Sequence, residues 1–294
     1  MQQVNSAEIC QTCGAGRTSK FCPNCGEKKP SPEDMRLKKY LLQGLDAFTH
    51  FEGKFFKSFK YLLFQPGKLT ADYVAGRRVK LMKPLQLYVI VGIAFFFLFK
   101  SWDIFFVRLQ YAILGNYDAE TGTTIAFKPG ELKGLSLALR NYAEAKASAK
   151  GISLLEFVVK VDGHQPALAK LLAFLMIPLM SLFIYATAFK QEKRYVPHLV
   201  HATHLFTFLL AIVTVWLCVY QLLEKWLHWN FDANIAFLPP NLLFIVYAFL
   251  SFRKVLPLRS VLLQILRTLV LIAGLIVIIP LYREIILWIS VMVE

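Results

Sequence analysis

The chain has 294 residues, of which 56% are hydrophobic, and its mean hydropathy is +0.50. This composition is too apolar for an ordinary soluble domain and predicts a membrane protein with several spans. The formal net charge is +14, but the basic residues gather in certain segments and leave others neutral. That distribution is typical of membrane topology rather than of nucleic-acid binding, so we expect no nucleic-acid partner.

Two cysteine pairs with the spacing Cys-x-x-Cys precede the apolar segments. They are Cys10 with Cys13 and Cys22 with Cys25, and eight residues separate the pairs. This arrangement is typical of a tetrahedral Cys₄ zinc site. A disulfide framework would belong to an oxidising compartment, and a redox pair would need a thioredoxin-like βαβ unit, which the sequence does not indicate. Residues 1–29 are therefore predicted to be a cytoplasmic zinc ribbon with one structural Zn²⁺.

Residues 30–84 are predicted to form an interfacial helix and a basic collar. Apolar residues from Leu37 to Leu62 recur three or four positions apart, with lysines mostly on the other flank. Such a helix lies in the membrane interface or packs its apolar face on the spans. The collar that follows either binds anionic headgroups or only fixes the topology. Its candidate headgroup ligands are Lys68, Arg77, Arg78, Lys80 and Lys83.

Residues 85–294 are predicted to be an all-α membrane domain with five spans, since about 20 helical residues cross the hydrocarbon core. The segments are Leu85–Trp102, Leu168–Phe189, Leu199–Leu223, Ile235–Phe252 and Val261–Tyr282. Residues 1–83 carry 15 Lys and Arg against 7 acidic residues, whereas residues 103–166 carry seven of each. The positive-inside rule therefore predicts a cytoplasmic N-terminus, with the segment 103–166 and the C-terminus extracytoplasmic. Within that segment we expect a strand near 121–127 and a helix over 131–150.

Three histidines open the third expected span. His198, His201 and His204 fan across about 120° of one helix face. Because polar groups in a membrane need partners, this face is either a metal, haem or proton-handling site, or a row of side chains hydrogen-bonded to neighbouring helices or headgroups. A metal would need further ligands from another segment, with Glu192 and His50 as candidates, since residues three apart on one helix rarely converge on a single ion.

Several short motifs follow one another in a fixed order. After the Cys-x-x-Cys-Gly pairs come Phe-Glu-Gly-Lys-Phe at 51–55, Gln-Pro-Gly at 65–67, Tyr-Val-Ala-Gly-Arg-Arg at 73–78, Lys-Pro-Leu at 83–85, and the segment from Tyr195 to His204. In this order they resemble the bacterial membrane family known as domain-of-unknown-function family 3667. The family pattern has an acidic residue before the first histidine, where this chain has Pro197. The resemblance covers most of the chain and implies a zinc-ribbon, multi-span inner-membrane protein, with no activity attached.

Three functions stay open. The leading hypothesis is a non-enzymatic protein of a bacterial inner membrane, in which the ribbon is a structural and docking module for a cytoplasmic protein partner and the membrane domain binds anionic lipid. A transporter of a small solute or lipid would be favoured by paired broken helices, but five spans divide poorly into halves. A membrane metalloenzyme would use the histidine face and would need carboxylates converging on it. No catalytic residue is assigned.

Overall fold

The computed structural model is mostly helical. It describes residues 8–17, 19–29, 31, 36–37, 54–98, 107–118, 123–126, 133–227 and 237–294. Most of the first half of the predicted interfacial helix and the candidate ligand His50 therefore lie outside the described residues. The chain divides into two compact units, and each has its own packing. Unit 1 comprises Met1–Lys100 and Ile177–Gly274, and unit 2 comprises Ser101–Met176 and Leu275–Glu294.

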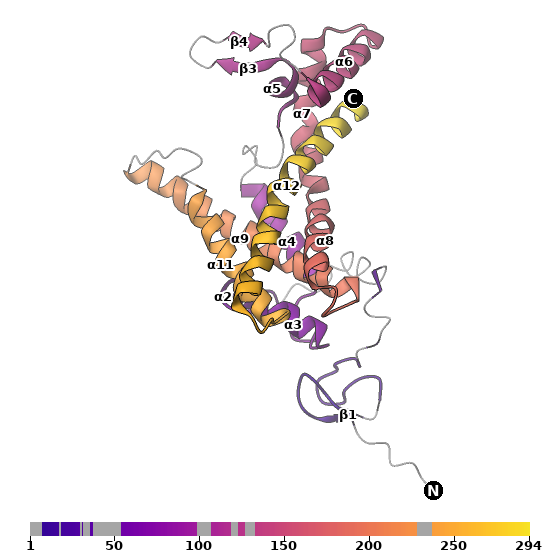
Figure 1. Cartoon of the computed structure of the whole chain (residues 1–294), viewed down its shortest axis with the longest axis vertical. Coiled ribbons are helices and arrows are strands. Elements are labelled where there is room, and N and C mark those ends of the chain that lie inside the picture. The colour runs from indigo at the N-terminus through magenta and orange to yellow at the C-terminus, as the bar shows by residue number, and fades with distance from the viewer. Residues whose placement is uncertain are drawn as a thin grey trace. The chain divides into compact units, whose positions relative to one another are not determined.

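Unit 1 consists of two short strands and a group of helices (Figure 1). Its elements are β1 Glu8–Ile9, β2 Gly16–Arg17, α2 Lys54–Phe64, α3 Lys68–Val74, α4 Pro84–Leu98, nearly all of α8 Met176–Ala188, α9 Tyr195–Leu227, α11 Leu238–Val255 and the first part of α12 Val261–Val293. The helix α9 lies at its centre and contacts α2, α3, α4 and α11. Aromatic packing joins these helices, since the Phe208 ring of α9 stacks on Tyr247 of α11 with ring centres 3.5 Å apart.

Unit 2 consists of a β-hairpin, three further helices and the second part of α12 (Figure 1). Its elements are α5 Leu109–Ile113, β3 Gly115–Asp118, β4 Thr123–Ala126, α6 Gly134–Ala149, α7 Leu154–Leu172 and the 3₁₀ turn η3 Ala173–Leu175. The hairpin is antiparallel and pairs Gly115 with Ala126. The strand expected near 121–127 and the helix expected over 131–150 thus correspond to β4 and α6.

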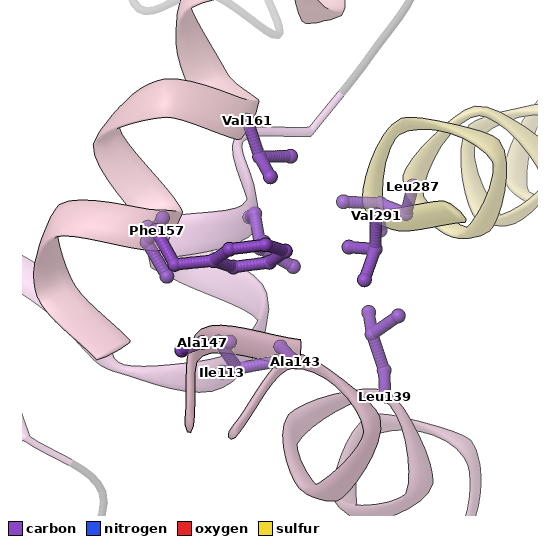
Figure 2. Close-up of a cluster of buried hydrophobic side chains, with 10 residues drawn as sticks. Ile113, Leu139, Ala143, Ala147, Phe157, Val161, Leu287 and Val291 are labelled. Atoms are coloured by element: carbon purple, nitrogen blue, oxygen red, sulfur yellow. The ribbon is translucent and has the colours of Figure 1, made fainter. Parts of the chain in front are cut away.

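The core of unit 2 is built around Phe157 of α7. Figure 2 shows its ring among side chains from α5, α6, α7 and α12, including Val161, Leu139 and Val291. Phe157 is fully buried, which is worth about 2–3 kcal/mol relative to an exposed ring. The Asp162 carboxylate accepts hydrogen bonds from the first N–H groups of α5 and so caps that short helix.

Three helical runs are long and apolar enough to cross a membrane. They are Leu154–Ala188, Tyr195–Trp226 and Val261–Val293, and most of each apolar window is not buried inside the protein. Exposed apolar side chains on α12 include Leu262, Leu269 and Ile276. In water such surface would be costly, whereas in lipid it is the ordinary outer face of a span. The first of the five predicted spans corresponds to α4, which is shorter, and the fourth corresponds to α11.

The turn between α2 and α3 approaches the end of α11 closely. Gly67 has φ 75°, and a Cβ at this position would lie 2.8 Å from the Ser251 carbonyl oxygen and 2.9 Å from the Lys254 Cβ. A side chain there would collide with backbone, and an L-residue would also be strained at this φ. Glycine therefore allows α2, α3 and the basic end of α11 to meet.

Candidate functional site

The four cysteines of the predicted ribbon gather at one point. The sulfurs of Cys10, Cys13, Cys22 and Cys25 all lie within 4.8 Å of one another. The two pairs fold alike, because Gly14 and Gly26 have positive φ and their N–H groups donate to the carbonyls of Cys10 and Cys22. Within the part of the chain that the structure describes, this is the one group of His, Cys, Asp or Glu side chains close enough to hold a metal ion.

The spacing of the sulfurs fits a tetrahedral ion. The Sγ atoms of Cys10 and Cys25 are 3.6 Å apart, and those of Cys13 and Cys22 are 3.5 Å apart. A metal–sulfur distance of about 2.3 Å gives a tetrahedron with edges of about 3.8 Å. The four thiols can therefore bind one metal ion without a large rearrangement.

The local electrostatics also favour a cation. The N–H groups of Thr12 and Cys13 lower the pKa of the Cys10 thiol to about 6, so this group is a thiolate at neutral pH. The Glu27 N–H lowers the pKa of the Cys25 thiol, but burial and the other sulfurs outweigh it and raise that pKa to about 12. The protein alone thus stabilises only part of the negative charge of four thiolates, and the positive charge of a divalent cation would stabilise the rest.

Glu27 joins the ribbon to the segment after α3. Its side chain is buried, and its Oε2 accepts hydrogen bonds from the N–H groups of Arg78 and Val79, both at 3.0 Å. The same oxygen accepts the Thr12 hydroxyl at 2.8 Å. One carboxylate oxygen therefore connects the first cysteine turn, the residues after the second cysteine pair and the basic collar.

A basic pocket of about 440 Å³ lies beside this junction. Thr12 of the ribbon forms part of its wall, together with Tyr61 and Asp72 from α2 and α3. Five cationic side chains from separate parts of the sequence line it: Lys57, Lys68, Arg77, Lys80 and Lys254. The structure thus brings three of the five predicted headgroup ligands together and adds one lysine from α2 and one from α11.

The other two predicted headgroup ligands do not line the pocket. The guanidinium of Arg78 lies 4.3 Å from the centre of the Tyr73 ring, and its Nε donates to the Tyr73 carbonyl at 3.1 Å. Lys83 is half-buried just before α4. Arg78 is thus placed to hold the collar against α3, while headgroup binding by either residue stays a prediction.

The three histidines of α9 point to different partners. His198 Nε2 donates to the Glu192 carbonyl at 2.8 Å. His201 Nε2 is 2.8 Å from the Ser251 hydroxyl of α11, and His204 Nδ1 is 2.9 Å from the Thr70 hydroxyl of α3. They therefore do not converge on one point, and each side chain connects α9 to a different neighbouring segment.

Glu192, the proposed additional ligand, is engaged elsewhere. Its carboxylate accepts from the Arg194 guanidinium at 2.9 Å through each oxygen. That hydrogen-bonded pairing lowers the pKa of the Glu192 carboxyl. The carboxylate is thus directed to Arg194, while only the Glu192 backbone reaches His198.

Sequence reasoning did not assign Thr12, Glu27, Lys57 or Lys254 to a site. Lys57 lies among the lysines on the polar flank of the predicted interfacial helix, and Lys254 lies just after the fourth expected span. The partners of these residues are distant in the chain, so no local spacing could identify them. The Gly67 of the Gln-Pro-Gly motif was the available signal, since a glycine in a turn often marks a close backbone approach.

The family comparison concerns the segment that forms the collar and its neighbouring helices. The family model described as protein of unknown function (DUF3667) matches residues 52–96, which include α2, α3 and most of α4. No curated protein and no solved structure matches the chain significantly. The resemblance to the DUF3667 family is therefore confirmed over residues 52–96, whereas its extension to the cysteine pairs and to the histidine segment stays a prediction.

Proposed function

We propose that the chain is a non-enzymatic integral protein of a bacterial inner membrane that binds anionic lipid at the basic collar. The ribbon binds one structural Zn²⁺ and is a docking module held on that collar. The collar, α2 and α3 then lie at the cytoplasmic face. The positive-inside distribution of charge supports this orientation, with α4, the run α7–α8, α9, α11 and α12 as five spans.

The observation that carries the proposal is the set of three hydrogen bonds that the Glu27 carboxylate accepts. Its Oε2 accepts from two backbone N–H groups of the collar and from a hydroxyl of the ribbon. Charge-assisted hydrogen bonds of this kind contribute about 1.5–3 kcal/mol each, and a buried N–H left without a partner is costly. A metal ribbon is therefore fixed at the basic segment rather than tethered loosely to it.

The outer surface of the ribbon offers a place for a protein partner. Ile9 and Phe21 are 65% and 54% exposed on this small module. Two apolar side chains beside a metal site are the ones through which a cytoplasmic protein would dock. The Glu27 bonds keep the ribbon on the collar while these two side chains stay exposed.

The test compares full-length Glu27→Ala protein with the wild type and with Glu224→Ala, which removes an exposed carboxylate from α9. Wild-type protein should retain phosphatidylglycerol or cardiolipin in native mass spectrometry. In the Glu27→Ala variant the amides of Arg78 and Val79 should exchange hydrogen at least tenfold faster, because they lose their acceptor. The metal content should be unchanged.

Two results would contradict the proposal. Equal amide exchange in the Glu27→Ala and Glu224→Ala proteins would mean that the ribbon is not held on the collar. Wild-type protein that carries no anionic lipid in native mass spectrometry would remove lipid binding from the function.

A further inference from the structure

We propose that the basic pocket binds a phosphate group with two negative charges, such as the terminal phosphomonoester of a lipid headgroup or a free phosphate. The inference rests on the proposed function, because the docked ribbon supplies one wall of the pocket through Thr12. It goes further by naming the ligand chemistry and the residues that recognise it. Two of these residues, Lys57 and Lys254, lie outside the collar.

The charge of the lining is strongly one-sided. Five cationic side chains line the pocket, and among the lining residues that the structure describes the only carboxylate is Asp72. Asp72 already accepts from Arg77 through Nε at 2.9 Å and through the terminal nitrogen at 2.5 Å. Among the residues that the structure describes, no carboxylate forms an ion pair with Lys57, Lys68, Lys80 or Lys254. Like charges brought this close together favour an anion between them.

The aromatic ring of Tyr61 positions two of the ammonium groups. Lys68 Nζ lies 4.3 Å from the ring centre and Lys57 Nζ lies 5.8 Å from it. Both contacts are within the range of a cation–π interaction, which restrains a flexible lysine without neutralising its charge. The Tyr61 ring therefore holds the two ammonium groups near one place.

The fold also fixes the part of the pocket that Lys254 lines. Lys254 lies in the last turn of α11, and its Cβ would be 2.9 Å from a Cβ at Gly67. This close approach brings the α11 lysine beside Lys68, which follows Gly67 directly in the chain. The contact that requires glycine in the turn thus also holds Lys254 at the pocket.

The number of donors favours phosphate over a carboxylate ligand. Each ammonium group offers three N–H donors, and the Arg77 guanidinium adds the N–H groups that do not bond to Asp72. A phosphate presents three or more oxygens to such donors, whereas a carboxylate presents two. A volume of about 440 Å³ accommodates a phosphate with a small attached group.

The experiment uses zinc-loaded full-length protein in nanodiscs and a triple variant, Lys57→Gln with Lys80→Gln and Lys254→Gln. Its matched control is Lys190→Gln with Lys193→Gln and Arg259→Gln, which removes the same charge from two other basic loops. Binding is measured for nanodiscs with phosphatidic acid or only phosphatidylcholine, and for added pyrophosphate or inorganic phosphate. We expect phosphate-group binding to fall about fivefold per lysine, on the order of 100-fold for the triple variant, and less at high salt.

The outcomes distinguish the source of the ligand and test the pocket itself. Binding of phosphatidic acid that free phosphate does not displace indicates a lipid headgroup, and displacement by free phosphate or pyrophosphate indicates a soluble ligand. A triple Lys→Arg variant at the same positions should keep binding, which shows that the Gln variant failed through charge and not through folding. Equal losses in the pocket and control variants, or no phosphate binding by the wild type, would overturn the proposal. Unchanged protection of the Arg78 and Val79 amides in that case would leave the seating of the ribbon intact.

Discussion

At Gly67 the backbone has φ 75°, and the carbonyl oxygen of Ser251 occupies the space that a Cβ would need. Ser251 in turn bonds to His201 through its hydroxyl. The Gln-Pro-Gly motif of the sequence thus has a physical reason: it lets the turn between α2 and α3 lie on α11. The same contact brings Lys254 into the basic pocket.

Replacing Gly67 with alanine should therefore destabilise the protein. Strain at positive φ costs about 1–2 kcal/mol and overpacking against backbone adds about 1–3 kcal/mol, so the variant should unfold several degrees below the wild type. Gly92→Ala in α4 is the control, since its Cβ would have nothing within 4 Å. That change should be neutral or slightly stabilising because alanine has the higher helix propensity. Thermal unfolding in detergent measures both, and equal midpoints would contradict the close approach.

The cysteine site gives a second test at single residues. Purified protein should carry about one Zn per chain, and Cys22→Ser should abolish stoichiometric metal because a serine hydroxyl is a poor ligand at neutral pH. Cys218→Ser, in α9, is the matched control and should leave the metal content unchanged. Elemental analysis of the two variants measures the number of zinc ions per chain. If Cys22→Ser protein kept one metal ion that a further His204→Ala change removed, the metal site would belong to the histidine face instead.

Among the elements, the cysteine cluster was the most predictable, because all four cysteines lie within sixteen residues of chain. For the histidine face, the sequence indicated that polar groups entering a membrane need hydrogen-bond partners, but it did not identify those partners. Thr70 lies 134 residues before His204, and Ser251 lies 50 residues after His201. Such partners depend on how α3 and α11 pack on α9, which no spacing in the sequence encodes.

The length of the helical run before the histidines shows a second limit of prediction from the sequence. An apolar window indicated a span over 168–189, whereas the structure continues the helical run back to Leu154. Gly163, Gln165 and Pro166 interrupt the apolar pattern, and the glycine and the proline also have poor helix propensity. Burial of neighbouring residues such as Val161 and Ala169 outweighs that propensity and keeps this stretch helical.

The bond between His204 and Thr70 should couple α9 to α3 energetically. In a double-mutant cycle, His204→Leu and Thr70→Val should show a coupling free energy of about 0.6 kcal/mol, the average for hydrogen bonds between membrane helices. The control cycle pairs His204→Leu with Thr214→Val, whose hydroxyl donates to the Leu210 carbonyl within α9. The two changes of the control cycle should be additive. Stability in detergent measures both cycles, and equal coupling in both would mean that the His204–Thr70 bond contributes nothing specific.

For the whole molecule, charge and apolar surface give separate information about the membrane. Apolar side chains exposed along the three long helices indicate contact with lipid, but they do not show which end of each helix faces the cytoplasm. Direction comes from the basic residues, since Lys190, Lys193 and Arg194 lie between α8 and α9, and Arg259 lies between α11 and α12. Both loops should be cytoplasmic, together with the collar.

Reporter fusions test this topology. Fusions after Phe189 and after Arg259 should be active as cytoplasmic reporters, and fusions near Asn141 and at Glu294 should be active as extracytoplasmic ones. The result at Glu294 depends most on α11, because its 18 residues include Asn241, Arg253 and Lys254 and it is not among the three strongest candidate spans. If α11 did not cross, Arg259 would report the extracytoplasmic side and Glu294 the cytoplasm, with the earlier fusions unchanged. Removing the positive charge at this end of α11, by neutralising Arg253, Lys254 and Arg259, should weaken the cytoplasmic signal of the fusion after Arg259, because positive charge is the feature that retains a loop in the cytoplasm.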